Sequence, residues 1–198
     1  MPESSAPSAR ATHAAIRRVA LSLFETEGYA NVTVAQVAAS AGVDPMTVYR
    51  HFGTKHGLVL RLGDDLGTPQ RLGEAFAAVA RPGGSLLDAV EATAAQWVEQ
   101  ASTELLDEAF RVVRLTATTP ELRNQAWNNV TAWAETYQPW VAELMPDVEP
   151  PQAELASRIA IDVVVAAGLV WATSSGDKAA ALAALRSMIA VARRVSRG

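Results

Sequence analysis

One short segment near the N-terminus gathers side chains that could contact DNA. Its outward residues, on a helix predicted to start at Asp44, are Pro45, Met46, Thr47, Tyr49, Arg50 and His51. A first short helix from Thr33 and a turn at Gly42 precede this segment, and the apolar residues Ala38 and Val48 would hold the two helices together. Two helices joined in this way form a helix-turn-helix, whose second helix enters the major groove of DNA.

The rest of the sequence offers no arrangement of residues for catalysis. The chain contains no cysteine, which excludes disulfides, cysteine-based zinc sites and thiol nucleophiles. Its three histidines, His13, His51 and His56, have no supporting cluster of carboxylates, so we expect no metal. We also find no phosphate-binding loop and no convincing pair of carboxylates, and therefore predict no cofactor and no enzymatic activity.

Composition and charge indicate a helical protein with two kinds of surface. Apolar residues make up 49% of the chain and charged residues 19%, and 39 alanines favour helix. The net charge is −4, yet residues 1–61 carry +2 and the remaining residues −6, which suggests a small polyanion-facing module joined to an acidic body. The first fifteen residues lack the apolar core of a signal peptide, and the longest uncharged apolar run, 163–175, is too short to span a membrane. We therefore expect a soluble, cytoplasmic protein.

Helix start and stop signals predict an all-α chain with an N-terminal three-helix DNA-binding domain and a larger helical body. The predicted parts are a flexible arm over residues 1–8, a helix-turn-helix domain over 9–61 and an effector-binding and dimerisation domain over 62–198. Gly28 would end the first helix, and Thr54 would cap a fourth that extends toward Leu66. Further helices are expected near 70–80, 85–101, 104–117, 120–145, 152–175 and 178–196. The apolar run 161–171 could be a buried strand, but no partner strands are evident.

An ordered series of residues covers about 50 positions near the N-terminus. It consists of Phe24, Gly28-Tyr29, Val32-Thr33-Val34, Val37-Ala38, Ala41-Gly42-Val43, Thr47-Val48-Tyr49, His51-Phe52, Lys55 and Leu58. This series resembles the N-terminal domain of the TetR family of one-component transcriptional regulators. His56 departs from the family pattern, where an acidic residue is usual, and Pro45-Met46 replaces a commoner small or polar pair.

The resemblance implies a role for each residue that matches or flanks the motif. Phosphate contacts are implied for Thr33, Thr47, Tyr49 and Lys55, contacts to base edges for Pro45, Met46 and Arg50, and further DNA contacts for Arg10, Arg17, Arg18 and His51. Some of these residues have an alternative, purely structural interpretation. Tyr49 and His51 could pack in the small domain, and Arg17 and Arg18 could be a solvated helix face.

The body is predicted to bind a small apolar effector. Trp127, Val130, Trp133, Tyr137, Trp140 and Leu144 follow a helical spacing, and Pro139 should kink their helix and leave space. Aromatic walls around an apolar cavity are typical of a small-molecule site, although a plain core stripe has the same spacing. The predicted lining residues are Trp97, Phe110, Arg114, Trp127, Asn128, Trp133, Tyr137 and Trp171.

The last two predicted helices are apolar on more than one face, which favours a homodimer. The predicted interface residues are Ile159, Val163, Ala166, Ala167, Val170, Leu185, Met188 and Ile189. The resemblance implies the same mode of dimerisation. Together these patterns predict a homodimeric repressor that binds a near-palindromic operator in double-stranded DNA and is released by the effector. The alternatives are an all-α protein-interaction module and a helical enzyme.

Overall fold

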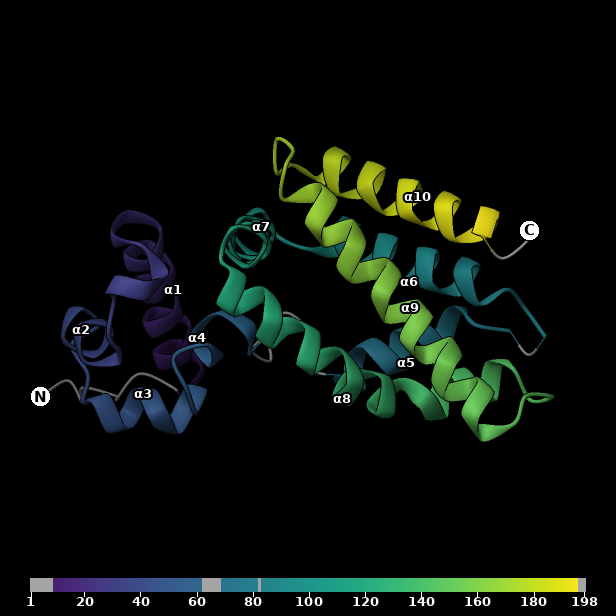
Figure 1. Ribbon diagram of the computed structural model, residues 1–198, viewed down its shortest axis with the longest axis horizontal. Helices are drawn as coiled ribbons and strands as arrows, with labels where there is room; N and C mark the ends of the chain where they lie inside the picture. The colour runs from purple at the N-terminus through teal and green to yellow at the C-terminus, as the bar shows by residue number, and fades with distance from the viewer. Residues whose placement is uncertain (1–8, 62–68, 82, 196–198) are drawn as a thin grey trace, which may run out of the picture. The chain divides into compact units, whose positions relative to one another are not determined.

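The computed structural model describes residues 9–61, 69–81 and 83–195, and all regular secondary structure in these ranges is helical (Figure 1). The all-α prediction is therefore confirmed, and the run 161–171 lies within a helix. The predicted arm over residues 1–8 lies outside the described residues. The chain forms two compact units, Met1–Gly63 and Asp64–Gly198.

The first unit contains the short helices of the predicted helix-turn-helix. Its helices are α1 (Ala9–Glu27), the 3-10 helix η1 (Tyr29–Asn31), α2 (Val34–Ser40), α3 (Pro45–Phe52) and α4 (Gly57–Leu60). Gly28 ends α1 with φ of 86°, a backbone conformation that favours glycine. The Thr54 hydroxyl accepts a hydrogen bond from the Gly57 N–H at 3.1 Å, close to the predicted cap. The helix α4 ends at Leu60, and the predicted extension over 62–66 lies outside the described residues.

The second unit consists of six described helices whose limits lie close to the predicted ones. They are α5 (Pro69–Val79), α6 (Leu86–Gln100), α7 (Thr103–Thr118), α8 (Pro120–Leu144), α9 (Pro150–Trp171) and α10 (Lys178–Val195). Ser85 and Ser102 cap α6 and α7 by accepting backbone N–H groups three residues later. The helix α9 packs against both α8 and α10, and α10 also packs against α6 (Figure 1). None of the described helices is long and apolar enough to cross a membrane.

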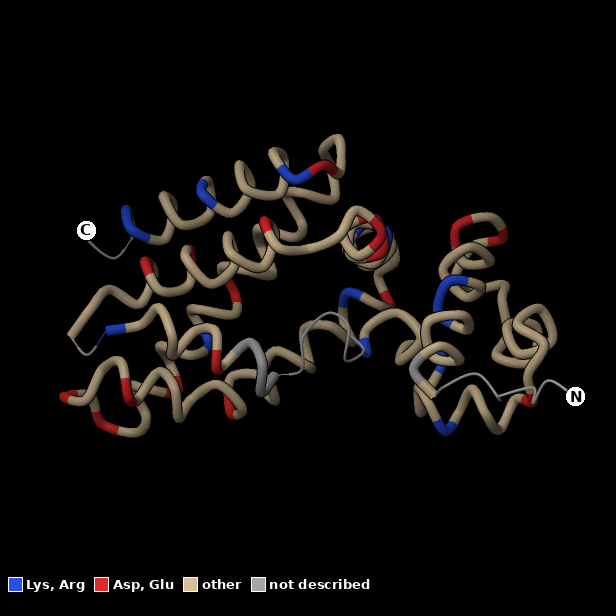
Figure 2. Tube along the Cα trace, turned by 180° about the vertical axis from the view of Figure 1, so that it is seen from behind, with Lys and Arg blue, Asp and Glu red and all other residues tan. Residues whose placement is uncertain are grey.

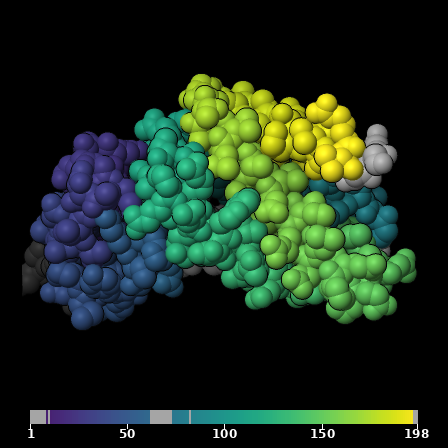
Figure 3. All heavy atoms as spheres, in the orientation of Figure 1, coloured from purple at the N-terminus to yellow at the C-terminus, as the bar shows by residue number. Residues whose placement is uncertain are grey.

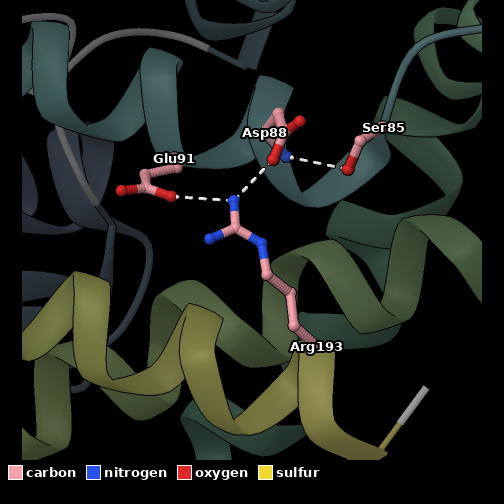
Figure 4. A network of polar contacts seen from close by, with 4 residues as sticks. All are labelled: Ser85, Asp88, Glu91 and Arg193. Carbon is pink, nitrogen blue, oxygen red and sulfur yellow. Dashed lines mark hydrogen bonds and ion pairs between the residues drawn. The ribbon is translucent and has the colours of Figure 1, made fainter. Parts of the chain in front are cut away.

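Both ends of α10 are tied to α6 by polar contacts. At its start, the Lys178 ammonium donates to the Glu99 carbonyl at 2.8 Å. Near its end, the Arg193 guanidinium donates to Asp88 and to Glu91 (Figure 4), and the hydrogen bond with Asp88 raises the pKa of Arg193. These side chains are partly exposed, so they orient the helix more than they stabilise it.

The apolar residues of α9 and α10 divide between the core and an exposed face, which corrects half of the predicted dimer interface. Four predicted interface residues are buried inside the single chain: Val163, Ala167, Leu185 and Ile189. They pack in one cluster with residues of α5, α6 and α8 and cannot also contact a partner. Of the other four, Ile159 and Val170 are exposed, whereas Ala166 and Met188 are half-buried.

The buried side of α10 predicts a strong dependence of stability on Ile189. This side chain is fully buried, so Ile189→Ala leaves a cavity that should lower the free energy of unfolding by about 2–5 kcal/mol. Urea denaturation followed by circular dichroism measures the loss. Val195→Ala on the same helix is the control, since Val195 is 78% exposed and its truncation should change stability by less than about 0.5 kcal/mol. Equal losses in the two variants would contradict the core assignment.

Candidate DNA-binding surface and effector region

The helix α3 presents its first turns to solvent from a well-defined start. The Asp44 carboxylate accepts the Met46 N–H at 2.7 Å, and Pro45 occupies the first helical position. On the inner side, Val48 and Phe52 are buried. On the outer side, Met46 is 70% exposed and Tyr49 47% exposed, so Tyr49 is not a core aromatic. Pro45 and Arg50 are also exposed, and Thr47 is half-buried.

His51 takes part in aromatic packing between α1 and α3. The ring of His13 stacks on Phe52 with centroids 4.3 Å apart and meets His51 edge-on at 6.0 Å. His51 is half-buried in this group. The structure thus gives His51 the packing role that the sequence left open, while its remaining exposure still adjoins the outer face of α3.

Thr33 caps the start of α2 by exchanging hydrogen bonds with Gln36. These bonds use the Thr33 N–H and hydroxyl, the two groups that could contact a phosphate. Its N–H donates to the Gln36 side-chain oxygen at 2.7 Å, and its hydroxyl accepts the Gln36 N–H at 3.2 Å. The spacing of Thr33 and Gln36 is that of a capping box, a signal that the sequence reasoning overlooked. The cap leaves Thr33 exposed, and a phosphate there would compete with the Gln36 side chain.

Lys55 is held over the aromatic residues that close the first unit. Its ammonium lies 4.3 Å from the centroid of the Tyr29 ring and 3.4 Å from the Ala30 carbonyl oxygen. A cation over an aromatic face is held electrostatically, and the carbonyl uses only one of the three ammonium donors. The buried residue Tyr29 therefore positions Lys55, a role that the sequence reasoning did not assign.

The prediction that Arg17 contacts DNA is wrong. Its side chain is 1% exposed, and its guanidinium donates to two backbone carbonyls of the same unit, those of Val59 and Arg61. Buried carbonyls need hydrogen-bond donors because water does not reach them. The Arg17 guanidinium supplies these donors and therefore does not reach the surface. The neighbouring Arg18 is exposed, and the side chain of Arg10 lies outside the described residues.

The second unit distributes the eight predicted lining residues over separate places, which corrects the prediction of one aromatic wall. Trp97, Phe110 and Trp171 pack in a cluster of α6, α7, α9 and α10, where the rings of Phe110 and Trp171 lie 5.3 Å apart. Trp133 and Tyr137 pack on α9 instead, and burial raises the pKa of Tyr137 to about 12. The remaining three are exposed: Arg114, Trp127 and Asn128. Of these, Arg114 still adjoins the first cluster, since its guanidinium lies 5.6 Å from the centroid of the Phe110 ring.

Two further features of the second unit bear on a ligand site. The helix α8 continues through Pro139 to Leu144, so the predicted kink does not end it. Val164 is 44% exposed, although Ile161 and Ala167, three residues to either side, are buried. Figure 3 shows the surface hollowed between α8 and α9. A shallow depression of about 340 Å³ lies elsewhere, on α6, lined by Asp88, Glu91, Ala92 and Ala95.

Charge separates the two units in the way the sequence indicated. Asp and Glu residues are distributed along the helices of the second unit (Figure 2), which carries the excess of negative charge. The outer face of α3 contains no acidic residue. A helix that exposes hydroxyl, aromatic, apolar and guanidinium groups without carboxylates suits the base edges and phosphates of DNA.

Comparison with known proteins agrees with this surface. Residues 16–62 match the family model described as bacterial regulatory proteins, tetR family. Two crystal structures of NalD from Pseudomonas aeruginosa, the secondary repressor of the MexAB-OprM multidrug efflux pump, share 20% and 21% identity with the chain. They match with TM-scores of 0.57 and 0.58 over 93% and 92% of this chain and 97% of each NalD chain. No curated protein matches the sequence.

A third solved structure, a transcriptional regulator from Aquifex aeolicus VF5, matches with a TM-score of 0.50 at 14% identity. It aligns over 91% of this chain and 98% of its own. The fold is that of helical transcriptional regulators with an N-terminal helix-turn-helix domain. Over residues 16–62, the chain is therefore similar to the N-terminal domain of the tetR family of bacterial regulatory proteins.

The exposure of Met46 generates a prediction about base preference. If Met46 contacts a base edge, as the resemblance implies, Met46→Ala should cost about 1–3 kcal/mol of binding free energy, concentrated at one or two base pairs of each half-site. Mobility shifts on a set of single-base operator variants measure this pattern. Helix content should not change, since Met46 is 70% exposed. A loss that is uniform over all sequences would remove Met46 from the base-reading residues.

The position of Lys55 generates a different prediction. If Lys55 contacts a phosphate, as the resemblance implies, Lys55→Ala should weaken binding to all operator variants alike and reduce the slope of log affinity against log salt by about 1. Titrations at several salt concentrations measure the slope. Lys178→Ala is the matched control, since that ammonium is bonded to a carbonyl in the second unit. If Lys55→Ala altered preference at one base pair, the phosphate assignment would be wrong.

Proposed function

We propose that the chain is a homodimeric repressor that binds a near-palindromic operator and is released by a small, largely apolar effector. The observation that carries the proposal is the start of α3, where Asp44 and Pro45 fix a helix end whose outward residues are exposed. A recognition helix contacts base edges through its N-terminal residues. The fold shared with NalD, which is a repressor, supports repression over activation.

We assign the outer face of α3 to two kinds of DNA contact. Met46 and Pro45 supply apolar surface suited to a thymine methyl, and the Arg50 guanidinium suits the paired acceptors of guanine. Tyr49 and Lys55 supply donors for phosphates, which set the register of the helix in the groove without reading sequence. Arg50 also lies within 3.5 Å of the Thr47 hydroxyl, a contact that orients it along the helix.

We assign dimerisation to the outer face of α9 together with α10. On α9, Leu155, Ile159, Ala166 and Val170 follow one another at spacings of four, seven and four residues and therefore share one side of the helix. Leu155 and Ile159 are 59% and 42% exposed in the single chain. Val191 extends the exposed apolar surface onto α10. A partner related by two-fold symmetry would bring the same residues and bury this surface.

We assign the effector to the region of the second unit between α8 and α9. The exposure of Val164 among buried neighbours supports open space there, and Trp133 and Tyr137 offer aromatic surface from α8. An effector that favours one separation of the two recognition helices would shift the equilibrium toward that state. Half-sites lie about 34–36 Å apart, so a change of a few Å in this separation would release DNA.

The proposed function is tested by selecting binding sites from random-sequence duplex DNA with the intact chain. We expect recovered sequences to contain an inverted repeat whose halves are about one turn of DNA apart. The recovered duplex should then shift the protein as a dimer in mobility-shift assays. Small apolar compounds can be screened for release of this complex. Recovery of single, unpaired half-sites would contradict the dimeric mode, and no enrichment at all would contradict sequence-specific binding.

The proposed dimer face makes its own prediction. Ile159→Glu should weaken dimerisation at least about 100-fold, because each protomer would bury an unpaired carboxylate. Analytical ultracentrifugation should show monomer, with loss of binding to the paired operator. Ala142→Glu is the control, because position 142 is exposed on α8 outside this face. Val163→Glu is not suitable, since Val163 is in the core of the single chain. A stable Ile159→Glu dimer would place the interface elsewhere.

A further inference from the structure

Arg17 is a charged side chain buried inside the DNA-binding unit. Its Nη1 donates to the Arg61 carbonyl at 2.7 Å and its Nη2 to the Val59 carbonyl at 3.0 Å. The side chain is 1% exposed. The two nitrogens of one planar guanidinium thus grip two carbonyls that are two residues apart, at the end of α4 and just beyond it.

This grip is better suited to fixing a direction than to adding stability. Burying a guanidinium costs free energy, and an apolar side chain of similar size often stabilises an interior at least as well. The last carbonyls of a helix lack partners within the helix, and a cation there is favourable. The fork geometry of arginine adds an orientation that a point charge cannot impose, since two parallel donors must meet two acceptors at once.

The grip connects the end of α4 to the helix that supports α3. Arg17 belongs to α1, and the same helix places His13 on Phe52, the last residue of α3, with ring centroids 4.3 Å apart. The first unit ends at Gly63, two residues after Arg61. Through α1, the recognition helix and the end of α4 at Arg61 therefore share one support.

We propose that Arg17 is the positioning residue that sets the half-site spacing the dimer accepts. The inference rests on the proposed dimeric binding of a paired operator. In a dimer, the main chain that leaves each unit after Arg61 joins its recognition helix to the body. If the exit is fixed relative to α3, an added base pair displaces one half-site by about 3.4 Å and rotates it by about a tenth of a turn, which the dimer cannot follow.

The test compares binding to operators that differ only in spacing. The duplex recovered by selection is shortened or lengthened by one base pair at its centre, and affinities are measured by fluorescence anisotropy. The unaltered chain should prefer the original spacing by about tenfold or more, because one added pair moves a half-site by about 3.4 Å. Arg17→Met, which keeps the volume and removes the donors, should reduce this preference below about threefold and leave base preferences within a half-site unchanged.

A merely structural role predicts another pattern, namely equal losses of affinity at every spacing together with a lower melting temperature. An Arg17→Met variant that keeps the tenfold preference would overturn the proposal. Arg61→Met is the matched control: it removes an exposed guanidinium but keeps the carbonyl that Arg17 contacts, and should keep the spacing preference.

Arg17→Lys decides the question if Arg17→Met does not fold. It keeps the charge and the apolar stem but not the fork, so its spacing preference should fall between those of the unaltered chain and complete loss. An unchanged preference in a folded Arg17→Lys protein would overturn the role of the fork. Failure of the proposed dimeric function gives a different result: the unaltered chain and Arg61→Met would both bind single half-sites and show no spacing preference. Failure of the role of Arg17 alone leaves the spacing preference the same in Arg17→Met as in the unaltered chain.

Discussion

The first unit depends on capped helix ends, because its helices α2 and α3 are too short to be stable alone. The helices α2 and α3 contain 7 and 8 residues, fewer than an isolated helix needs in water. Each begins at a side-chain cap, Thr33 or Asp44, that satisfies backbone N–H groups at the helix start. Burial of apolar side chains in the unit, Val48 and Phe52 of α3 among them, stabilises these helices further. The same caps leave the start of α3 unobstructed for DNA.

Because caps are local, the sequence alone predicted most of the first unit. The pair Asp44-Pro45, the glycine at position 28 and Thr33 are read from a few neighbouring residues, and the structure has each of them at the expected helix limit. Arg17 could not be predicted in this way. Its partners, Val59 and Arg61, are more than 40 residues away and are backbone atoms, so no side-chain pattern marks them. An arginine on an amphipathic helix is ordinarily exposed.

The second unit shows where periodicity stops being informative. An apolar stripe indicates that a helix face is buried but not which helix, ligand or partner buries it. In α9 and α10 the apolar residues cover several faces. Val163 and Ile189 are buried in the core of the single chain. The aromatic residues of α8 follow one spacing, yet Trp127 is exposed whereas Trp133 and Tyr137 pack on α9. Only the packing of neighbouring helices separates these cases.

The helix α9 lies between the proposed effector region and the proposed dimer face, which are on different sides of it. Val164 lies on the side directed to the proposed effector region, and Ile159 lies on the proposed dimer face. A helix with side chains is about 10–12 Å across, so a ligand on one side and a partner on the other would contact the same rigid rod. Tight packing allows such a rod to shift between discrete positions and not to deform continuously. An effector held against α9 would thereby change the dimer geometry, and with it the separation of the two α3 helices.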